Sequence, residues 1–75
     1  MKIQEKFQYV LIAEVGEGKR YSANALGKLS GITSQTIMNA LKGKPSTLYN
    51  MQCVLDALGY EVSITKKENT DETGN

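Results

Sequence analysis

The sequence has no histidine, no tryptophan and a single cysteine among its 75 residues. Without an imidazole the commonest general base of enzymes is missing, and the lone cysteine, Cys53, has no base to activate it. No group of cysteines and histidines has the spacing of a zinc site. Gly16 and Gly18 lack the lysine–serine continuation of a nucleotide-binding loop. We therefore expect neither catalysis nor a bound metal or organic cofactor.

Long apolar runs are also missing. No stretch of about 18 apolar residues exists, and charged residues interrupt the N-terminal segment where a secretory signal needs a clean apolar core. One cysteine cannot form an internal disulfide and suits a reducing compartment. These absences predict a cytoplasmic protein with no membrane partner. The length allows one small domain, near the size at which pairing with a second copy adds needed stability.

Acidic residues are absent from the middle of the chain. Residues 18–55 contain no aspartate or glutamate, although the whole chain has a net charge of only +1. The same window holds five basic residues, namely Lys19, Arg20, Lys28, Lys42 and Lys44. A surface that faces a polyanion needs such a window, because a carboxylate within it would repel phosphate. Chance clustering in a short chain is the alternative interpretation.

Apolar spacing predicts an all-α fold of four to five helices. Residues 3–15 form the first helix, although Tyr9 and Ile12 fall off its main stripe and indicate either a second buried face or a different element. Ser22 is expected to cap a second helix that ends at Gly31, with Leu26 and Leu29 facing inward.

Two further helices follow. Thr33 is expected to cap a helix over residues 34–42, which Ile37 anchors in the core. Pro45 and Ser46 are expected to open the last helix, with Ser46 as its cap. Its inward stripe spans an arc of about 120° and consists of Leu48, Met51, Val54, Leu55 and Leu58.

The segment after this helix alternates apolar and polar residues. Tyr60, Val62 and Ile64 share one side, as in a half-buried strand. A lone strand needs a partner for its backbone groups, and the simplest partner is the same strand of a second copy related by a two-fold axis. Residues 1–65 are thus expected to form one domain and a homodimer, and the polar residues 66–75 a disordered tail.

The stretch "ALGKLSGITSQTIMNALKGK" has the parts of two short helices joined by a tight turn. Gly27 permits close approach of the second helix and Gly31 suits a turn with positive φ, while Leu26, Ile32 and Ile37 fill the wedge between the helices. With "PSTLYNMQCVLDALGY", residues 22–59 resemble the phage-repressor and Cro-like (XRE-type) helix-turn-helix family. Position 27 is glycine where that family usually has alanine.

The resemblance implies a lambda-repressor-like domain that binds double-stranded DNA in a sequence-specific way, as a small transcriptional regulator and most simply a repressor. The helix over residues 34–42 then enters the major groove. The amides of Gln35 and Asn39 suit the edge of adenine, and Ser34 and Met38 complete the expected base contacts. The expected phosphate contacts are Ser22, Asn24, Thr33, Lys42, Lys44, Ser46, Thr47 and Asn50, and Lys19 and Arg20 add to the positive field.

An interaction protein is the alternative function. Helix-turn-helix scaffolds also bind other proteins, and some antitoxins of this type bind a toxin and repress their own operon. The "LGYEVSI" segment resembles regulators and antitoxins that close a dimer with a short C-terminal strand. Binding of duplex DNA that weakens with salt distinguishes the two functions.

Overall fold

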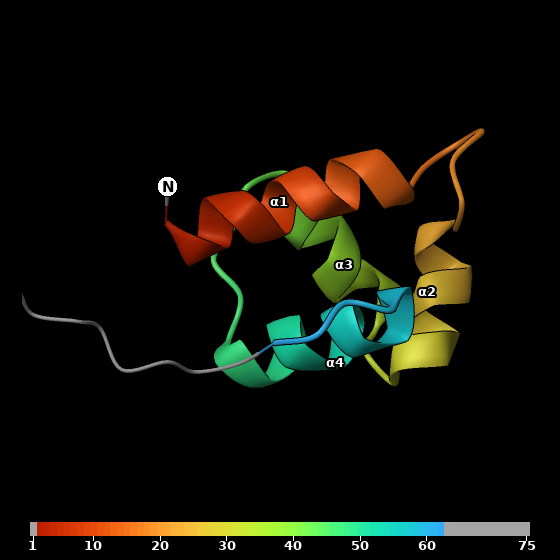
Figure 1. Ribbon diagram of the computed structural model, residues 1–75. Helices are drawn as coiled ribbons and strands as arrows, with labels where there is room; N and C mark the ends of the chain where they lie inside the picture. The colour runs from red at the N-terminus through yellow and green to blue at the C-terminus, as the bar shows by residue number, and fades with distance from the viewer. Residues whose placement is uncertain (1, 63–75) are drawn as a thin grey trace, which may run out of the picture.

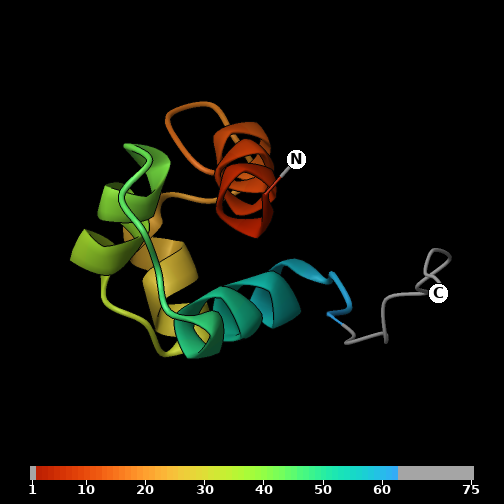
Figure 2. The same ribbon diagram turned by 90° about the vertical axis from the view of Figure 1, so that its left-hand side faces the viewer.

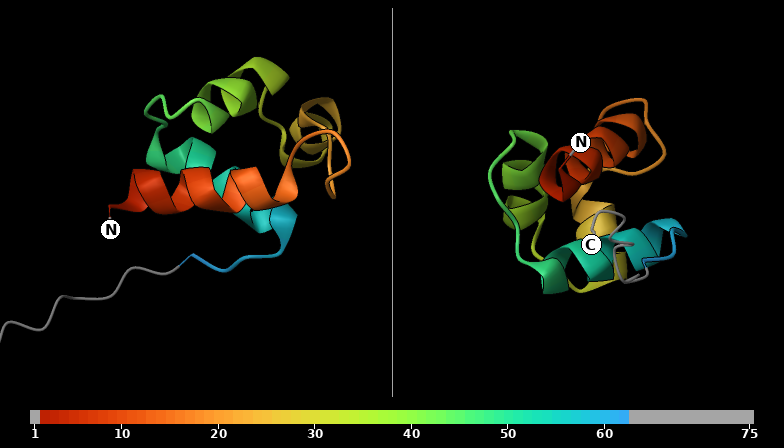
Figure 3. Two further views of the ribbon diagram at one scale, coloured as in Figure 1. Left: turned by 90° about the horizontal axis from the view of Figure 1, so that it is seen from above. Right: turned by 60° about the vertical axis from the view of Figure 1, so that its left-hand side comes forward.

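Figure 1 shows a computed structural model of the protein, in which residues 2–62 are described. This part contains four helices, in the order α1 (Ile3–Glu14), α2 (Ala23–Ser30), α3 (Ser34–Leu41) and α4 (Leu48–Leu58). α2 packs against α3 and α4, and α1 packs against α3. α1 and α4 run across opposite sides of the molecule, and α2 closes one end (Figures 1 and 3). The all-α prediction is confirmed for residues 2–62.

Hydroxyl side chains fix the starts of three helices. In each case the side-chain oxygen accepts a hydrogen bond from a backbone N–H in the first turn, which satisfies a donor that the helix itself leaves open. Ser22 and Thr33 cap α2 and α3 as the sequence predicts. The three bonds run from Ala25 N to Ser22 Oγ (3.1 Å), from Thr36 N to Thr33 Oγ1 (3.2 Å) and from Asn50 N to Thr47 Oγ1 (3.1 Å).

The prediction that Ser46 caps the last helix is wrong, because Thr47 has that role. The Gln4 side chain explains the difference. Its amide donates to the carbonyl oxygen of Ser46 at 2.7 Å and accepts from the backbone nitrogen of Ser46 at 3.0 Å. Both backbone groups of Ser46 are thereby tied to α1, so the helix begins one residue later than expected.

The core lies between the four helices and is built from one side of each. Leu26 and Ile37 are buried in it, as predicted for the wedge between α2 and α3. Leu29 and Leu48 were expected inside, but their exposed fractions are 57% and 67%. Each lies at the edge of its helix's apolar stripe, where no other element within residues 2–62 covers it. The buried apolar residues are Phe7, Leu11, Val15, Leu26, Ile37, Ala40, Met51, Val54 and Leu58.

α1 has a single buried face. Tyr9 and Ile12 have exposed fractions of 60% and 46%, so neither the second buried face nor the different element that they suggested is present. The helix ends at Glu14, and Val15 then forms an isolated bridge with Tyr21 across the loop to α2. No helix within residues 2–62 combines the length and the apolar character that crossing a membrane requires.

Two glycines set the geometry of the α2–α3 connection. Gly31 has a φ of 76° and ends α2 in the left-handed conformation, which glycine adopts without a steric penalty. A Cβ atom at Gly27 would lie 2.7 Å from the carbonyl oxygen of Ile32 and 3.3 Å from the nitrogen of Ser34. The turn therefore lies directly on α2 at Gly27, as the sequence predicts.

Residues 60–62 follow α4 in irregular conformation. The backbone nitrogen of Tyr60 donates to the carbonyl oxygen of Leu55 at 2.8 Å, which completes the end of the helix after Gly59. Ile64 and the predicted tail over residues 66–75 lie outside the described residues. The pairing of this segment with a second copy stays a prediction.

Candidate nucleic-acid interface

The outer side of α3 presents the side chains that were predicted to contact bases. Ile37 is 1% exposed and faces the core, which turns the opposite side of the helix outward. Gln35 and Met38 are exposed, and Ser34 and Asn39 are half-buried. All four predicted base contacts therefore reach the surface from one short helix.

The two amides on this surface are joined to each other. Gln35 Nε2 donates a hydrogen bond to Asn39 Oδ1 over 3.1 Å, between residues one helical turn apart. The bond fixes the orientation of both amide planes. It leaves the Gln35 oxygen, the second Gln35 N–H, the Asn39 NH2 group and the second lone pair of Asn39 Oδ1 available to another molecule. Sequence reasoning selected both residues but did not foresee their bond.

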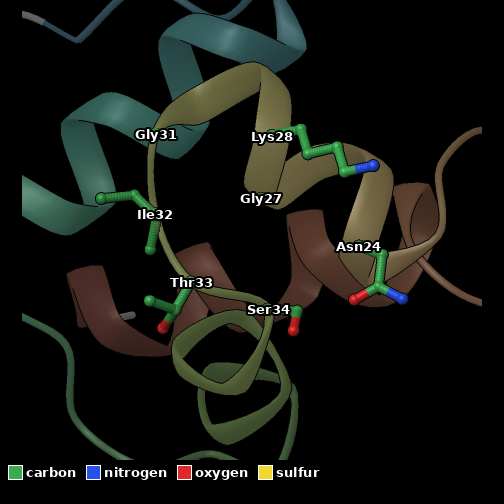
Figure 4. Close-up of a pocket in the computed structure, with 7 residues that line it drawn as sticks. All are labelled: Asn24, Gly27, Lys28, Gly31, Ile32, Thr33 and Ser34. Atoms are coloured by element: carbon green, nitrogen blue, oxygen red, sulfur yellow. The ribbon is translucent and has the colours of Figure 1, made fainter.

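A hollow of about 320 Å³ lies beside the start of α3. Figure 4 shows Asn24 and Lys28 of α2 on one side of it, and Thr33 and Ser34 at the start of α3 on the other. Asn24, Lys28 and Thr33 are exposed. Lys28 was not among the predicted contacts, although its position within residues 18–55, which contain no acid, indicated that it could contact DNA.

Three of the predicted phosphate contacts are helix caps. Ser22, Thr33 and Thr47 are exposed, and each stands at the N-terminus of a helix. A helix N-terminus attracts anions through its partial positive charge and its open backbone N–H groups. A capping oxygen accepts this hydrogen bond through a lone pair, so its own proton can be donated to a phosphate. The Thr33 hydroxyl also shares a hydrogen bond with Thr36 Oγ1 over 2.8 Å.

The α3–α4 connection is held in place by α1. Gln8 Nε2 donates to the carbonyl oxygen of Leu41 over 3.0 Å, and Gln4 holds Ser46 at the other end of the connection. Lys42 and Lys44 between these anchors are exposed. Figure 2 shows the connection passing outside the helices from α3 to α4.

The two glutamines were not recognised from the sequence. Their spacing of one helical turn along α1 was visible, but the backbone groups that they bind lie 33 and 42 positions away in the chain. Among the other predicted phosphate contacts, Ser46 and Asn50 are half-buried, and Asn50 lies in the first turn of α4.

Arg20 is engaged within the fold. Its guanidinium lies 3.6 Å from the Glu14 carboxylate and donates to the carbonyl oxygen of Leu58 over 3.4 Å. It also lies over the ring of Tyr21, 5.1 Å from its centroid. The positive field expected from Arg20 is therefore partly cancelled by Glu14. Lys19 is exposed.

Tyr49 adds no negative charge to residues 18–55. It lies in the first turn of α4, and a hydrogen bond with the Cys53 thiol raises the pKa of its hydroxyl above the ordinary value of 10.0. An ordinary tyrosine hydroxyl is already neutral at physiological pH, and a raised pKa keeps it so. Residues 18–55 keep the purely positive character that the sequence gives them.

Comparisons of the chain with models of known protein families, with curated proteins and with solved structures gave no match.

Proposed function

We propose that the protein is a small transcriptional regulator of the phage-repressor type, which binds a specific sequence of double-stranded DNA with α3 in the major groove. The observation that carries this proposal is the outer side of α3. It combines the exposed amide of Gln35 and the half-buried amide of Asn39 with a surrounding 38-residue stretch that contains no acid (residues 18–55). In this function α2, the turn at Gly31 and α3 act as a helix-turn-helix unit.

The side chains of α3 provide the chemistry for reading base edges. An amide can donate to N7 and accept from N6 of one adenine, so Gln35 and Asn39 favour A·T pairs. Their mutual hydrogen bond reduces the conformational freedom that binding would otherwise remove. Met38, which is 42% exposed, is suited to apolar contact with a thymine methyl group.

The proposed phosphate contacts lie around the outer side of α3. The caps Ser22, Thr33 and Thr47 donate to the DNA backbone, assisted by the dipoles of their helices. Lys42 and Lys44 contribute charge from the connection that α1 holds. Such contacts position the protein on the duplex and supply salt-sensitive affinity, whereas base contacts determine the sequence.

Selection of bound duplexes from a random pool tests the proposal directly, because it reveals binding and sequence preference together. A selected duplex should bind with an affinity that falls as salt rises, by about 0.9 logarithmic units per neutralised phosphate for each tenfold increase in salt. A folded protein that enriches no sequence and shows no salt-dependent binding would refute the proposal.

Substitutions distinguish the recognition of base edges from the attraction of lysine to phosphate. Gln35→Ala and Asn39→Ala should each lower the affinity for the selected duplex by about 1–3 kcal/mol and flatten the sequence preference. Lys44→Ala should weaken binding to all duplexes alike and lower the salt slope. Gln52→Ala is the matched control, because it removes an exposed amide from α4 and should change neither quantity.

Exposed apolar side chains favour a second candidate, a protein-binding module such as an antitoxin. Leu48 and Tyr49 begin α4 with exposed fractions of 67% and 71%. Paired exposed side chains of this size suit a protein partner. Under this alternative, Gln35→Ala and Asn39→Ala have no effect on any duplex, and Leu48→Asp abolishes partner binding.

A further inference from the structure

Two half-buried glutamines of α1 bind the backbone at both ends of the α3–α4 connection. Gln8 Nε2 donates over 3.0 Å to the carbonyl oxygen of Leu41, the last residue of α3. Gln4 binds both backbone groups of Ser46, at 2.7 Å and 3.0 Å. The glutamines are four positions apart and therefore share one face of α1. A single helix thus holds the connection at its start and near its end.

The backbone between these two points is also held. The nitrogen of Gly43 donates to the carbonyl oxygen of Ala40, and the nitrogen of Lys44 donates to the carbonyl oxygen of Asn39, each over 3.0 Å. Gly43 lies directly against Gln8, because a Cβ atom at Gly43 would be 3.3 Å from Gln8 Nε2. The connection therefore follows a path that α1 and the end of α3 fix together.

We propose that Gln4 and Gln8 are positioning residues for DNA binding, which act through Lys42 and Lys44 without touching the duplex. This inference rests on the proposed function. Both lysines are exposed and extend from the backbone that the glutamines hold. A lysine on a fixed backbone loses less conformational freedom on meeting a phosphate than a lysine on a mobile loop. α1 thereby raises the affinity for DNA, although α3 recognises the bases.

A neutral amide suits this role. Gln4 must donate to one backbone group of Ser46 and accept from the other, and Gln8 must donate to a carbonyl oxygen. A carboxylate could donate to neither carbonyl oxygen, and a lysine could not accept from the Ser46 nitrogen. A carboxylate at Gln8 would also place a negative charge against Gly43, between the two lysines, and weaken their attraction for phosphate.

Titration of a duplex selected from the random pool tests the proposal. Gln8→Met keeps the length and the helix propensity of the side chain but removes its amide. It should lower the affinity about two- to tenfold, because the connection must then be ordered on binding. In a chain that also carries Lys42→Ala and Lys44→Ala, Gln8→Met should have no effect, since no lysine is left to position. Gln52→Met, the same change at an exposed residue of α4, is the matched control and should leave the affinity unchanged.

The cycle distinguishes positioning from a general loss of stability. If Gln8→Met weakened binding equally with and without the two lysines, its effect would not act through them and the proposal would be overturned. The same holds if Gln8→Met left the affinity unchanged while the lysine variants lowered it, and in both cases the proposed function would stand. A wild-type chain that binds no duplex would refute the proposed function and this inference with it.

A measurement without DNA tests the structural part of the inference. In nuclear magnetic resonance relaxation of the free protein, Gln8→Met should lower the amide order parameters of Gly43 and Lys44, because one attachment of the connection is lost. The order parameters of α2 should stay unchanged, and Gln52→Met should alter none of these values. Unchanged order parameters at Gly43 and Lys44 would show that Gln8 does not hold the connection, and would overturn the proposal whatever the duplex titrations give.

Discussion

Replacement of Gly27 by alanine sets two effects of known size against each other. Alanine favours the helical conformation over glycine by about 1 kcal/mol in a helix interior. Against this, its Cβ would lie 2.7 Å from the carbonyl oxygen of Ile32, a distance that real Cβ contacts do not show. The contacted atom belongs to the backbone of the turn, so rotation of a side chain cannot relieve the clash.

The steric effect should be the larger one. Overpacking of a tight contact costs about 1–3 kcal/mol, because the surrounding backbone must move. Subtraction of the gain in helix propensity leaves an expected net loss of about 1 kcal/mol in the free energy of unfolding. For a domain of this size the melting temperature should fall by about 4–8 °C. The nitrogen of Ser34 lies 3.3 Å from the same Cβ, so the start of α3 should shift as well.

Thermal unfolding followed by circular dichroism measures the effect. Ala25→Gly provides the matched control, because Ala25 is an exposed residue of the same helix and reports propensity without a steric contact. That change should cost about 0.5–1 kcal/mol. The reasoning requires that both substitutions lower the melting temperature. A Gly27→Ala protein that melts above the wild type would show that the gain in helix propensity exceeds the steric cost and that the turn does not lie in close contact with α2.

Three further substitutions test the remaining contacts. Thr33→Ala should lower the free energy of unfolding by about 1 kcal/mol in urea denaturation, whereas Thr33→Ser should not, and equal losses would contradict the capping role. Gln4→Ala removes two hydrogen bonds to Ser46 and should cost about 1–2 kcal/mol. The Ser46 amide should then exchange its hydrogen faster, and an unchanged rate would refute the anchoring role. Arg20→Ala should alter the salt slope of DNA binding less than Lys44→Ala, since Arg20 is already paired with Glu14; equal changes in titrations at several salt concentrations would disprove this.

Local features of the fold could be predicted from the sequence because their causes are local. A hydroxyl before a helix and a glycine after it act within one turn, so Ser22, Thr33 and Gly31 were assigned correctly. The inward position of Ile37 followed from apolar spacing, and it placed Gln35 outside. The candidate base contacts could therefore be selected without a structure.

Features that depend on distant segments could not be predicted. The cap of α4 moved from Ser46 to Thr47 because Gln4, 42 positions earlier, binds the backbone of Ser46. Leu48 belongs to the apolar stripe by spacing, but whether another element covers it is a property of the assembled fold. The internal engagement of Arg20 likewise depends on the end of α4, which is 38 positions away.

Under the proposed function, the bond between Gln35 and Asn39 has a consequence for how the sequence preference can change. An amide that loses its partner is free to turn over and exchange its donor with its acceptor, which alters what it recognises. A replacement at either position thus affects the other, and the losses from the two alanine variants should not be additive. A change in the base that this helix recognises would therefore require substitution of both residues together.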